Sequence, residues 1–476
     1  MYDLTIIGGG VTGAALAYEL SRYSLKVLLV EKENDLAMGA TRANTAIVHG
    51  GYDPKPGTLM AKLNARGARR CMELCEKLDI EFCKTGSHVI AFDDEDKETL
   101  ELLYEQGRIN GVEGLEIIDG DEARRREPNL SKEVVAALWV PESGVINPWE
   151  FAIAMAEVAV REGLELRRNW EVVDIEKRKE GFCLRSSEGE EVETKFVVNA
   201  AGVHAESIHS LVEKADFSII PTRGEYFLLD RVGGDSVKSI IFQCPKPQGK
   251  GVLVSPTVHG NILVGPNAEV VEDPEDCSVS QKALDEVAKS SRRSVPNLDF
   301  RLNIRNYAGI RANSSTGDFV VQWAVPKFLD LAAIKSPGLT CAPTLAELAV
   351  ELLAEAGLEL VEKEAWRGKR KIIRFKSLSD TERAKLVQNN PLYGRVICRC
   401  ETITEGEVVA AIHREIMPVS IDGLKRRCGT GMGRCQGGFC APKLQKILAR
   451  ETGLNMEEIV QDKAGSYILL EDEEEA

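Results

Sequence analysis

The sequence predicts a fold that combines the α/β and α+β classes and consists of three parts. Residues 2–32 run through a β-branched segment, a glycine-rich turn, an apolar helix and a second β-branched segment. Residues 219–305 contain short runs that are typical of antiparallel strands. After residue 395, four cysteines stand in two closely spaced pairs. A chain of 476 residues is long enough for about two to four domains.

The first part has the spacing of a dinucleotide-binding motif of the Rossmann type. Gly8, Gly10 and Gly13 follow one strand and open a helix, and Glu31 ends the next strand. Gly8 permits a tight turn, Gly10 permits close approach of a pyrophosphate, and Gly13 lets helix and strand pack closely. The helix N-terminus favours phosphate, and Glu31 is placed to accept a hydrogen bond from a ribose hydroxyl. The motif alone leaves FAD and NAD(P) open.

Charge and composition exclude several classes of protein. The net charge of −15 argues against nucleic acid and against an anionic membrane surface as partners. No apolar run reaches the roughly 18 residues of a membrane span. The chain enters a strand at its start, which leaves no room for a signal peptide. Twelve cysteines are too few for a disulfide scaffold of this length, so we expect a cytoplasmic protein with reduced thiols.

Further small-residue, glycine-containing turns occur at residues 39–51, 200–202 and 337–340. The first can pass over a flat cofactor without steric conflict, and each of the other two follows a buried strand. A helix N-terminus after such a turn favours negative charge. One large cofactor that touches all the turns explains their spread along the chain, so FAD is favoured over a nicotinamide. The side chains in the first turn that can hydrogen-bond to the cofactor are Thr41, Arg42 and Asn44.

The cysteine pairs predict a metal centre. Cys398 and Cys400 lie two residues apart, and Cys435 and Cys440 lie five apart in a glycine-rich loop before a helix. In an extended strand, residues two apart share a face, so the first pair can hold one metal atom. Thiolates beside a helix N-terminus are electrostatically favoured, and four in two pairs suit zinc or a [2Fe–2S] cluster. If the chain also binds a flavin, a [2Fe–2S] cluster is favoured over zinc, because the cluster can carry electrons away from the flavin and zinc cannot. The role of the nearby Cys428 stays open.

These patterns predict a discontinuous organisation of the chain. The FAD-binding domain is expected at 1–80, 146–215 and 306–362, the substrate domain at 81–145 and 216–305, a linker at 363–390, the [2Fe–2S]-binding domain at 391–455 and an acidic tail at 456–476. Thr404-x-x-Glu407 is a capping box that opens a helix in the cysteine-bearing domain, and Ser420 is placed to cap another. Glu471–Glu475 are expected to be disordered and solubilising. The basic stretch 363–376 has two interpretations, a solvated linker or a docking face for an acidic partner.

Taken together, these residues resemble the D-amino-acid-oxidase-like FAD oxidoreductases, and among them the FAD-dependent glycerol-3-phosphate dehydrogenases, across roughly residues 1–360. The last domain resembles the bacterioferritin-associated-ferredoxin type of [2Fe–2S] module. The resemblance implies FAD and a [2Fe–2S] cluster as cofactors, with the four paired cysteines as cluster ligands and Arg311 as the substrate-binding arginine. It matches FAD-binding positions to Gly8, Gly10, Thr12, Gly13, Glu31, Thr41, Val172, Gly202, Gly338 and Leu339. Neighbours expected to contribute are Val11, Lys32, Arg42, Asn44, Ala201, Gly309 and Thr340.

One departure from that family leaves the substrate open. Its members place an arginine shortly after a His-Gly-Gly sequence, whereas here His49-Gly50-Gly51 is followed by Tyr52-Asp53-Pro54-Lys55. This pattern, and the segment Arg223-Gly-Glu-Tyr226, are as similar to L-2-hydroxyglutarate oxidases. The resemblance therefore implies either glycerol 3-phosphate or L-2-hydroxyglutarate as the substrate.

Both compounds are small anions with a secondary alcohol, so one chemistry is expected. A base, His49 or His259, removes the hydroxyl proton while hydride passes to the flavin N5, and Arg311 and Arg223 hold the anionic end. His259 is expected on a strand of the substrate domain. Electrons then leave through the cluster to a partner redox subunit that carries flavin or iron–sulfur, in a hetero-oligomer, and not to NAD directly. An interpretation of another class is a non-catalytic electron-transfer subunit.

Overall fold

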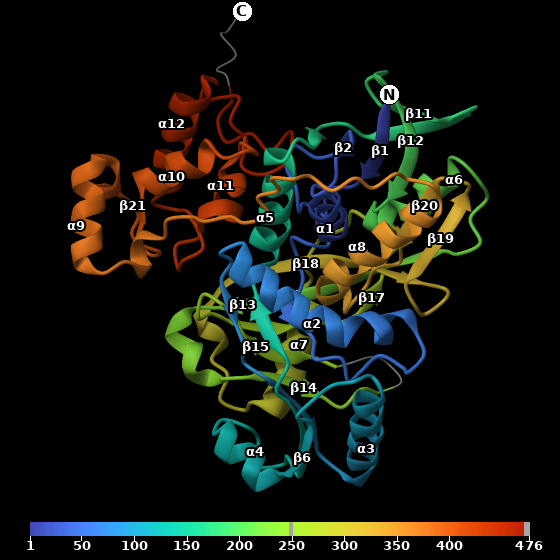
Figure 1. Cartoon of the computed structure of the whole chain (residues 1–476). Helices are drawn as coiled ribbons and strands as arrows, with labels where there is room; N and C mark the ends of the chain where they lie inside the picture. Colours follow the sequence, from blue (N-terminus) through green and yellow to red (C-terminus); the bar gives the residue numbers. More distant parts are fainter. Residues whose placement is uncertain (247–250, 471–476) are drawn as a thin grey trace, which may run out of the picture.

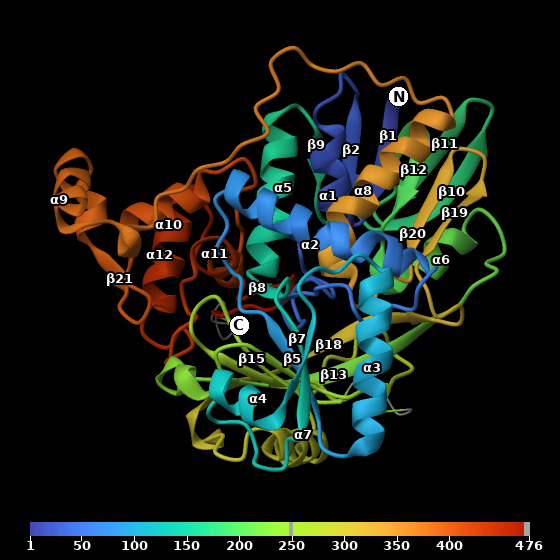
Figure 2. The same ribbon diagram turned by 60° about the horizontal axis from the view of Figure 1, so that its bottom comes forward.

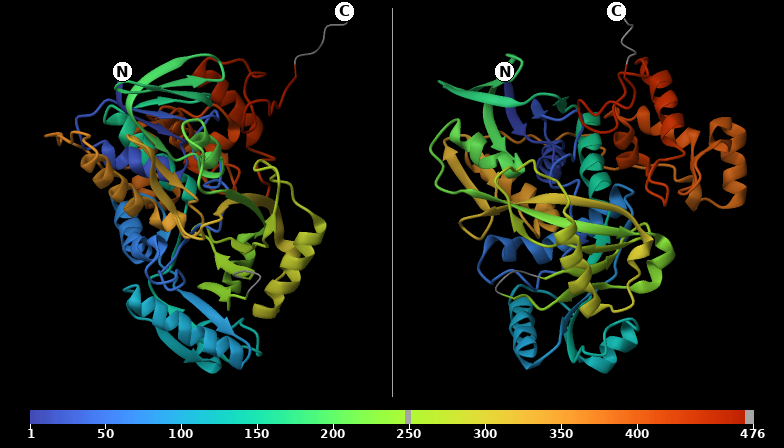
Figure 3. Two further views of the ribbon diagram at one scale, coloured as in Figure 1. Left: turned by 90° about the vertical axis from the view of Figure 1, so that its right-hand side faces the viewer. Right: turned by 180° about the vertical axis from the view of Figure 1, so that it is seen from behind.

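The computed structural model describes residues 1–246 and 251–470 of the chain, so the expectation for Glu471–Glu475 lies outside the described residues. Figure 1 shows an N-terminal sheet with its helices at the top, a second sheet below it, and a C-terminal helical domain at one side. Seen from two further directions, α3 (Asp94–Ile109) lies at the end of the molecule opposite the N-terminal sheet (Figure 3). Within the described ranges, no helix combines the length and apolarity of a membrane crossing.

The first sheet collects strands from distant parts of the chain. Its order is β10-β11-β12-β1-β2-β9, and β20, with β19 beside it, extends it from β12. β1 pairs in parallel with β12 and β2, and β12 pairs in parallel with β20. Because these strands run in parallel, their carboxyl ends, and the turns that follow, meet at one edge. The strands are β1 (Tyr2–Ile7), β2 (Val27–Val30), β9 (Glu165–Arg167), β10 (Val172–Arg178), β11 (Gly181–Ser186), β12 (Glu191–Asn199), β19 (Val320–Val325) and β20 (Phe328–Ala332).

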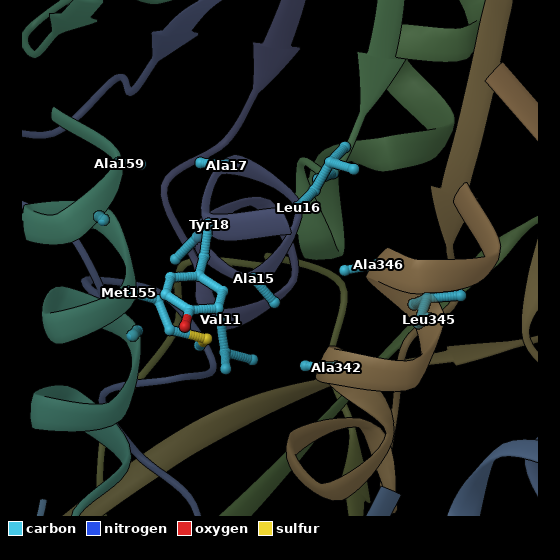
Figure 4. Close-up of a cluster of buried hydrophobic side chains, with 14 of the residues drawn as sticks. Val11, Ala15, Leu16, Ala17, Tyr18, Met155, Ala159, Ala342, Leu345 and Ala346 are labelled. Carbon is cyan, nitrogen blue, oxygen red and sulfur yellow. The ribbon is translucent and has the colours of Figure 1, made fainter. Parts of the chain in front are cut away.

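Helices α1 (Val11–Leu20), α5 (Pro148–Arg161) and α8 (Gly338–Glu355) pack together against this sheet, and α2 (Leu59–Lys77) packs on α8. Figure 4 shows α1 between α5, which presents Met155, and α8, which presents Ala342. Small side chains at these contacts let the helices approach closely. Leu16 is fully buried here, and burial of such a side chain contributes about 1.5–3 kcal/mol.

The second sheet is mostly antiparallel, as expected for 81–145 and 216–305. Its order is β17-β13-β16-β15-β14-β5-β7-β6, with β18 on the other side of β13. α4 (Gly120–Arg126) and α7 (Gln281–Ser294) accompany it, together with α3. The strands are β5 (Ser87–Ala91), β6 (Glu116–Asp119), β7 (Ala136–Val140), β13 (Ile219–Leu229), β14 (Ile240–Gln243), β15 (Leu253–Pro256), β16 (Ile262–Gly265), β17 (Glu269–Val270) and β18 (Asn303–Ser314).

Two features refine the expected domain boundaries. β18 pairs with β13 as far as Ser314, so the boundary expected at 305/306 falls inside a strand, and we place it after β18. β3 (Ile47–Val48), β8 (Gly144–Ile146) and β4 (Phe82–Cys83) form a small separate sheet where the chain crosses between the two larger parts. We propose this crossing as the place where the boundaries expected near residues 80 and 145 fall.

The C-terminal domain is mostly helical. It contains α9 (Asp380–Asn389), β21 (Val396–Cys398), β22 (Ile403–Thr404), α10 (Glu405–Ile412), α11 (Ile421–Cys428) and α12 (Ala441–Thr452). Thr404 and Glu407 form the predicted capping box of α10, and Ser420 caps α11 through the backbone N–H of Gly423. A separate core that includes Val408, Leu424 and Leu444 holds these helices together.

Part of the basic segment before this domain is bound to the first part of the molecule, while Arg367, Lys369 and Lys371 are exposed. Residues 356–374 run across the helices of the first part towards α9 (Figure 2). Arg370 is buried and pairs with Glu150 at 2.6 Å and Glu157 at 3.0 Å, and Arg374 also pairs with Glu150. Lys363 donates to main-chain carbonyls. These side chains therefore fasten the segment to the first part.

Candidate active site

The glycine-rich turn after β1 is as tight as its sequence predicts. Gly8 has φ of +105°, and a Cβ there would lie 2.6 Å from the carbonyl oxygen of Ala200 in the neighbouring turn. A Cβ on Gly13 would lie 2.0 Å from the carbonyl oxygen of Gly8. Gly10 is the N-cap of α1, so the turn leads directly to the helix N-terminus. Bare backbone and helix N–H groups thus converge where a pyrophosphate would bind.

Glu31, directly after β2, turns its carboxylate back towards this turn. It is 8% exposed, and its oxygens accept hydrogen bonds from the N–H of Gly9 at 2.7 Å and of Glu33 at 3.0 Å. Burial raises the pKa of this carboxyl to about 7. A buried carboxylate with remaining acceptor capacity suits a ribose hydroxyl, so the residues present fit a dinucleotide. Val172 is buried at the start of β10. Two residues earlier, the backbone N–H of Trp170 donates to the backbone carbonyl of Glu31, so Val172 lies near Glu31.

Lys32 points towards the second part of the molecule. Its ammonium donates to Glu275 at 2.6 Å, and Glu275 also lies 2.7 Å from the ring of His204. His204 ends a short 3₁₀ turn, Gly202–His204, directly after β12. The loop that carries Glu275 therefore bridges the ends of β2 and β12.

The loop 39–51 supplies one direct contact to the motif and several internal ones. The hydroxyl of Thr41 accepts a hydrogen bond from the N–H of Val11 at 3.0 Å, at the N-terminus of α1 beside Thr12. Arg42 pairs with Asp462 at 2.6 Å, and Asn44 donates to the carbonyls of Ala40 and Thr41. Thr41 thus lies beside the N-terminus of α1, whereas Arg42 faces the C-terminal segment and Asn44 shapes the loop.

The two later turns reach the same edge of the sheet. The N–H of Ala201 donates to Asn199 at 3.3 Å, and Gly202 has φ of +60°. Gly338, Leu339 and Thr340 form the first turn of α8.

A buried network that sequence reasoning missed supports the first of these turns. Asn199 donates to Asp330 at 2.7 Å, and Asp330 lies 2.6 Å from Nδ1 of His209. These residues lie on β12, β20 and α6 (Ala205–Ser210).

His49 is held between the loop and α8. Its backbone N–H donates to the hydroxyl of Thr340 at 2.9 Å, and its carbonyl accepts a hydrogen bond from Asn64 at 2.7 Å. The ring packs near Phe242 with 5.8 Å between ring centroids, and Nε2 lies 3.2 Å from the hydroxyl of Ser336. The imidazole is thus positioned by the third turn.

Arg311 and Arg223 lie on opposite faces of the second sheet. Thr222 is opposite Arg311 in the β13–β18 register, and neighbouring residues along a strand alternate in face. The guanidinium of Arg311 donates to the carbonyl of Asn267 at 3.1 Å. Burial raises the pKa of Tyr226, and the nearby Arg311 partly opposes this rise. Arg223 is buried and is paired with Glu269 at 2.7 Å and with Asp276.

Gly309 shares the face of Arg311. A Cβ on Gly309 would lie 2.0 Å from the carbonyl oxygen of Ala43, and the nearby Tyr307 donates to the carbonyl of Asn44 at 3.1 Å. The Arg311 face of β18 therefore contacts the same loop that carries His49.

His259 lies elsewhere, in a turn between β15 and β16 and not on a strand. It is 3.5 Å from Glu81, and burial lowers its pKa although Glu81 opposes this. It lines a cavity between the second part and the C-terminal domain, together with Arg414 and Cys428. The structure does not bring it to the loop of His49.

The four predicted cysteine ligands gather in two pairs. Cys400 and Cys435 have their sulfurs 3.9 Å apart, and a hydrogen bond with Cys440 lowers the pKa of Cys398 to about 6. Among the described residues no three His, Cys, Asp or Glu side chains surround one point as a single metal ion requires. Two thiolates on one tetrahedral metal lie about 3.8 Å apart, so separate pairs fit a centre with two irons.

Cys428 stands outside the two pairs. Its thiol contacts the carbonyl of Leu424 at 3.2 Å, and burial raises its pKa to about 11.

The C-terminal domain is fastened to the first part close to Glu31. Asp35 pairs with Arg426 at 2.9 Å and with Arg427 at 2.7 Å, and all three side chains are buried. Asp462 joins Arg426 to Arg42. These residues were missed by sequence reasoning, because ion pairs between residues about 390 positions apart leave no local pattern.

These features define a flavoprotein oxidoreductase with an added iron–sulfur domain. Residues 3–352 match the FAD dependent oxidoreductase family, and residues 396–450 match the BFD-like [2Fe-2S] binding domain. The chain therefore belongs to the FAD-dependent oxidoreductases. FAD is the cofactor of this family, and the C-terminal domain is of the [2Fe–2S]-binding kind, which confirms both predicted cofactors.

The chain is also similar to three individual proteins of known type. A glycerol 3-phosphate dehydrogenase of Caloramator mitchellensis is 46% identical over 98% of both chains. The structure of an L-α-glycerophosphate oxidase of Mycoplasma pneumoniae with FAD bound is 33% identical, has a TM-score of 0.75 and covers 78% of this chain and 99% of its own. The mitochondrial L-2-hydroxyglutarate dehydrogenase of Homo sapiens is 32% identical over 56% of this chain and 61% of its own.

Proposed function

We propose that this enzyme oxidises sn-glycerol 3-phosphate to dihydroxyacetone phosphate with FAD and passes the electrons through a [2Fe–2S] cluster to a partner protein. The assignment of the substrate rests on the 46% identity to a glycerol 3-phosphate dehydrogenase along 98% of both chains, a match that includes the C-terminal domain. L-2-Hydroxyglutarate is the second candidate, supported by the 32% identity to its dehydrogenase over 56% of this chain. The longer match favours glycerol 3-phosphate.

The FAD would be held at the edge where the parallel strands end. Gly8 to Gly13 and the N-terminus of α1 would face its pyrophosphate, and Glu31 a ribose. The turns at Ala201–Gly202 and Gly338–Thr340 would line the rest. When bound, FAD supplies at its N5 an acceptor for the hydride of the alcohol carbon.

His49 is the proposed base, since the third turn positions its imidazole and its ring lies in the loop that contacts the Arg311 face. Arg311 is proposed to hold the anionic end of the substrate through charge-assisted hydrogen bonds. The alcohol O–H and C–H bonds break and a ketone forms, so one proton and one hydride leave each substrate molecule. We assign structural roles to Arg223 and His259. Arg223 is paired with the carboxylates of Glu269 and Asp276, and His259 lies at the interface with the C-terminal domain.

Cys398, Cys400, Cys435 and Cys440 are the proposed cluster ligands, and a [2Fe–2S] cluster supplies a one-electron carrier. Oxidation of one alcohol releases two electrons, which reduce two equivalents of a one-electron acceptor. The acceptor is proposed to be a separate redox subunit with flavin or iron–sulfur, bound in a hetero-oligomer.

The test is an anaerobic titration of the oxidised holoenzyme with glycerol 3-phosphate, followed by the flavin absorption band. Bleaching is expected with glycerol 3-phosphate and not with L-2-hydroxyglutarate. The reverse preference would establish the second candidate. If neither compound bleaches the flavin, both proposed substrates are ruled out, and the alternative of a non-catalytic electron-transfer subunit gains support.

A further inference from the structure

The loop that carries two of the proposed cluster ligands presents a side chain of unusual exposure. Phe439, next to Cys440, is 83% exposed, which makes it the most exposed aromatic side chain of the described residues. Single exposed apolar residues are common, so Phe439 alone indicates little. Phe439 becomes informative because exposed cations lie close to it in the sequence.

Phe439 lies in the turn that leads into α12, two residues before the helix begins. The helix buries Leu444, Ile447 and Leu448 against the domain core. Lys443 and Lys446 are both exposed and lie three residues apart, a spacing that places the two lysines on one helix face. α11 contacts both α12 and α5, and Figures 1 and 2 show α12 on the side of α11 away from α5.

These cations have no carboxylate partner in the part of the chain that the structure describes. Arg450, further along the helix, pairs with Glu405 and Glu451, whereas Lys443 and Lys446 form no such pair. Arg399, between Cys398 and Cys400, is likewise exposed and unpaired. The side chains of Cys398 and Cys440 are hydrogen-bonded to each other, so their chain neighbours Arg399 and Phe439 lie in the same part of the domain.

We propose that Phe439, Arg399, Lys443 and Lys446 form the docking surface for an acidic one-electron carrier protein; the inference rests on the proposed function. An acidic face is complementary to the cations, and the aromatic ring supplies an apolar centre of the kind enriched at interfaces. The remaining negative charge of the chain opposes the approach little at physiological salt, where the Debye length is about 8 Å. Electron-transfer interfaces are small, so a few side chains suffice.

A membrane is the less favoured occupant of this surface. Juxtamembrane cations contribute about 1 kcal/mol each at an anionic surface, and stable attachment relies on larger clusters than three. The net charge of −15 acts against such a surface as well. Vesicles of phosphatidylserine are therefore included in the test as a competing occupant.

The test uses oxidised holoenzyme and two oxidised haem proteins, the acidic soluble domain of cytochrome b5 and the basic cytochrome c. Binding is measured by calorimetry between about 0.01 M and about 0.15 M ionic strength. We expect cytochrome b5 to bind, with an affinity that falls with salt, and cytochrome c not to bind. K443E/K446E should weaken binding of cytochrome b5 by about tenfold or more at low salt.

The matched control is K282E/K289E, which makes the same charge change on exposed lysines of α7 and should leave binding unchanged. F439A should weaken binding while the salt dependence is retained. Equal binding by K443E/K446E and wild type, a preference for cytochrome c, or vesicle binding that K443E/K446E abolishes would each overturn the proposal. Anaerobic bleaching of the flavin by glycerol 3-phosphate in the same samples tests the proposed function separately, because binding of the oxidised proteins needs no turnover.

Discussion

Asp35 accepts a hydrogen bond from Nη2 of Arg427 at 2.7 Å, although 391 residues of chain separate the two. Arg426 shares the same carboxylate. Burial by itself would raise the pKa of Asp35, but Arg427 and Arg426 hold it well below its usual range. This pair joins the iron–sulfur domain to the loop that follows β2 and Glu31.

D35N should release the C-terminal domain from the first part. Removal of one partner of a buried ion pair costs about 3–5 kcal/mol, because the guanidinium groups stay buried without a counter-charge. Faster proteolytic cleavage within residues 363–390, with the flavin still bound, is the expected readout. Because the folded pKa is depressed, the stabilisation is present above the unfolded pKa of about 3.9 and is lost as the pH falls below it. Wild type should therefore keep the contact from pH 5 to 8.

G13A should prevent stable FAD binding. Its Cβ would lie 2.0 Å from the carbonyl oxygen of Gly8, so either α1 or the turn must move. Overpacking of this kind costs about 1–3 kcal/mol or more. G394A is the control, since Gly394 lies in the C-terminal domain and a Cβ there would meet only the side chain of Val387, at 3.1 Å. The flavin content of the purified variants and their melting temperatures measure both effects, and normal flavin content in G13A would contradict the assignment of the turn.

R311A and R223A should affect different properties of the enzyme, substrate binding in the first and thermal stability in the second. R311A should raise KM for glycerol 3-phosphate by about 10- to 100-fold with flavin content preserved, because a charge-assisted hydrogen bond is lost. R223A should lower thermal stability instead, since Glu269 and Asp276 lose their partner. Steady-state kinetics and thermal melting on both variants separate the two roles. An unchanged KM in R311A would remove Arg311 from the site.

H49N should lower kcat by about 10²- to 10⁴-fold, the usual contribution of a general base, with little effect on KM. H259N serves as the comparison, because His259 lies at the interface with the C-terminal domain and not at the loop of His49. The rate of flavin bleaching in stopped-flow experiments measures the step directly. A larger loss in H259N than in H49N would reverse the assignment.

C435S should lose the visible absorption of the cluster, while C428S should keep it. Cys435 lies within 3.9 Å of Cys400, whereas the Cys428 thiol contacts the carbonyl of Leu424. Glycerol 3-phosphate should still bleach the flavin of C435S, but reduction of a one-electron acceptor protein should cease. Iron content and absorption spectra of the two variants provide the check.

The dinucleotide motif was predictable because its chemistry is local. The spacing of Gly8, Gly13 and Glu31 follows from one strand–turn–helix–strand unit, and the Thr404–Glu407 capping box is equally local. FAD followed from turns that recur after parallel strands. The fold classes and both cofactors could therefore be predicted from the sequence.

Other features depend on the register of strands and on docking, which no short pattern encodes. Arg223 and Arg311 both looked suited to an anion, but the pairing of β13 with β18 turns them to opposite faces. His259 could be assigned to a strand of the second sheet, yet it lies in a turn that meets the C-terminal domain. In the basic stretch 363–376, Arg370 and Arg374 pair with carboxylates on α5, which is distant in sequence.

The scattered origin of the first sheet also constrains how the protein is made. β1 and β2 emerge early from the ribosome, whereas β20 and the first turn of α8 follow only after residue 327. Nascent chains fold from the N-terminal side, so the flavin pocket is complete only once this late segment has been translated. The iron–sulfur domain is translated later still, and its arginines must then find Asp35 on an already assembled surface. Translation order thus allows the proposed flavin site to form before the C-terminal domain is available to dock.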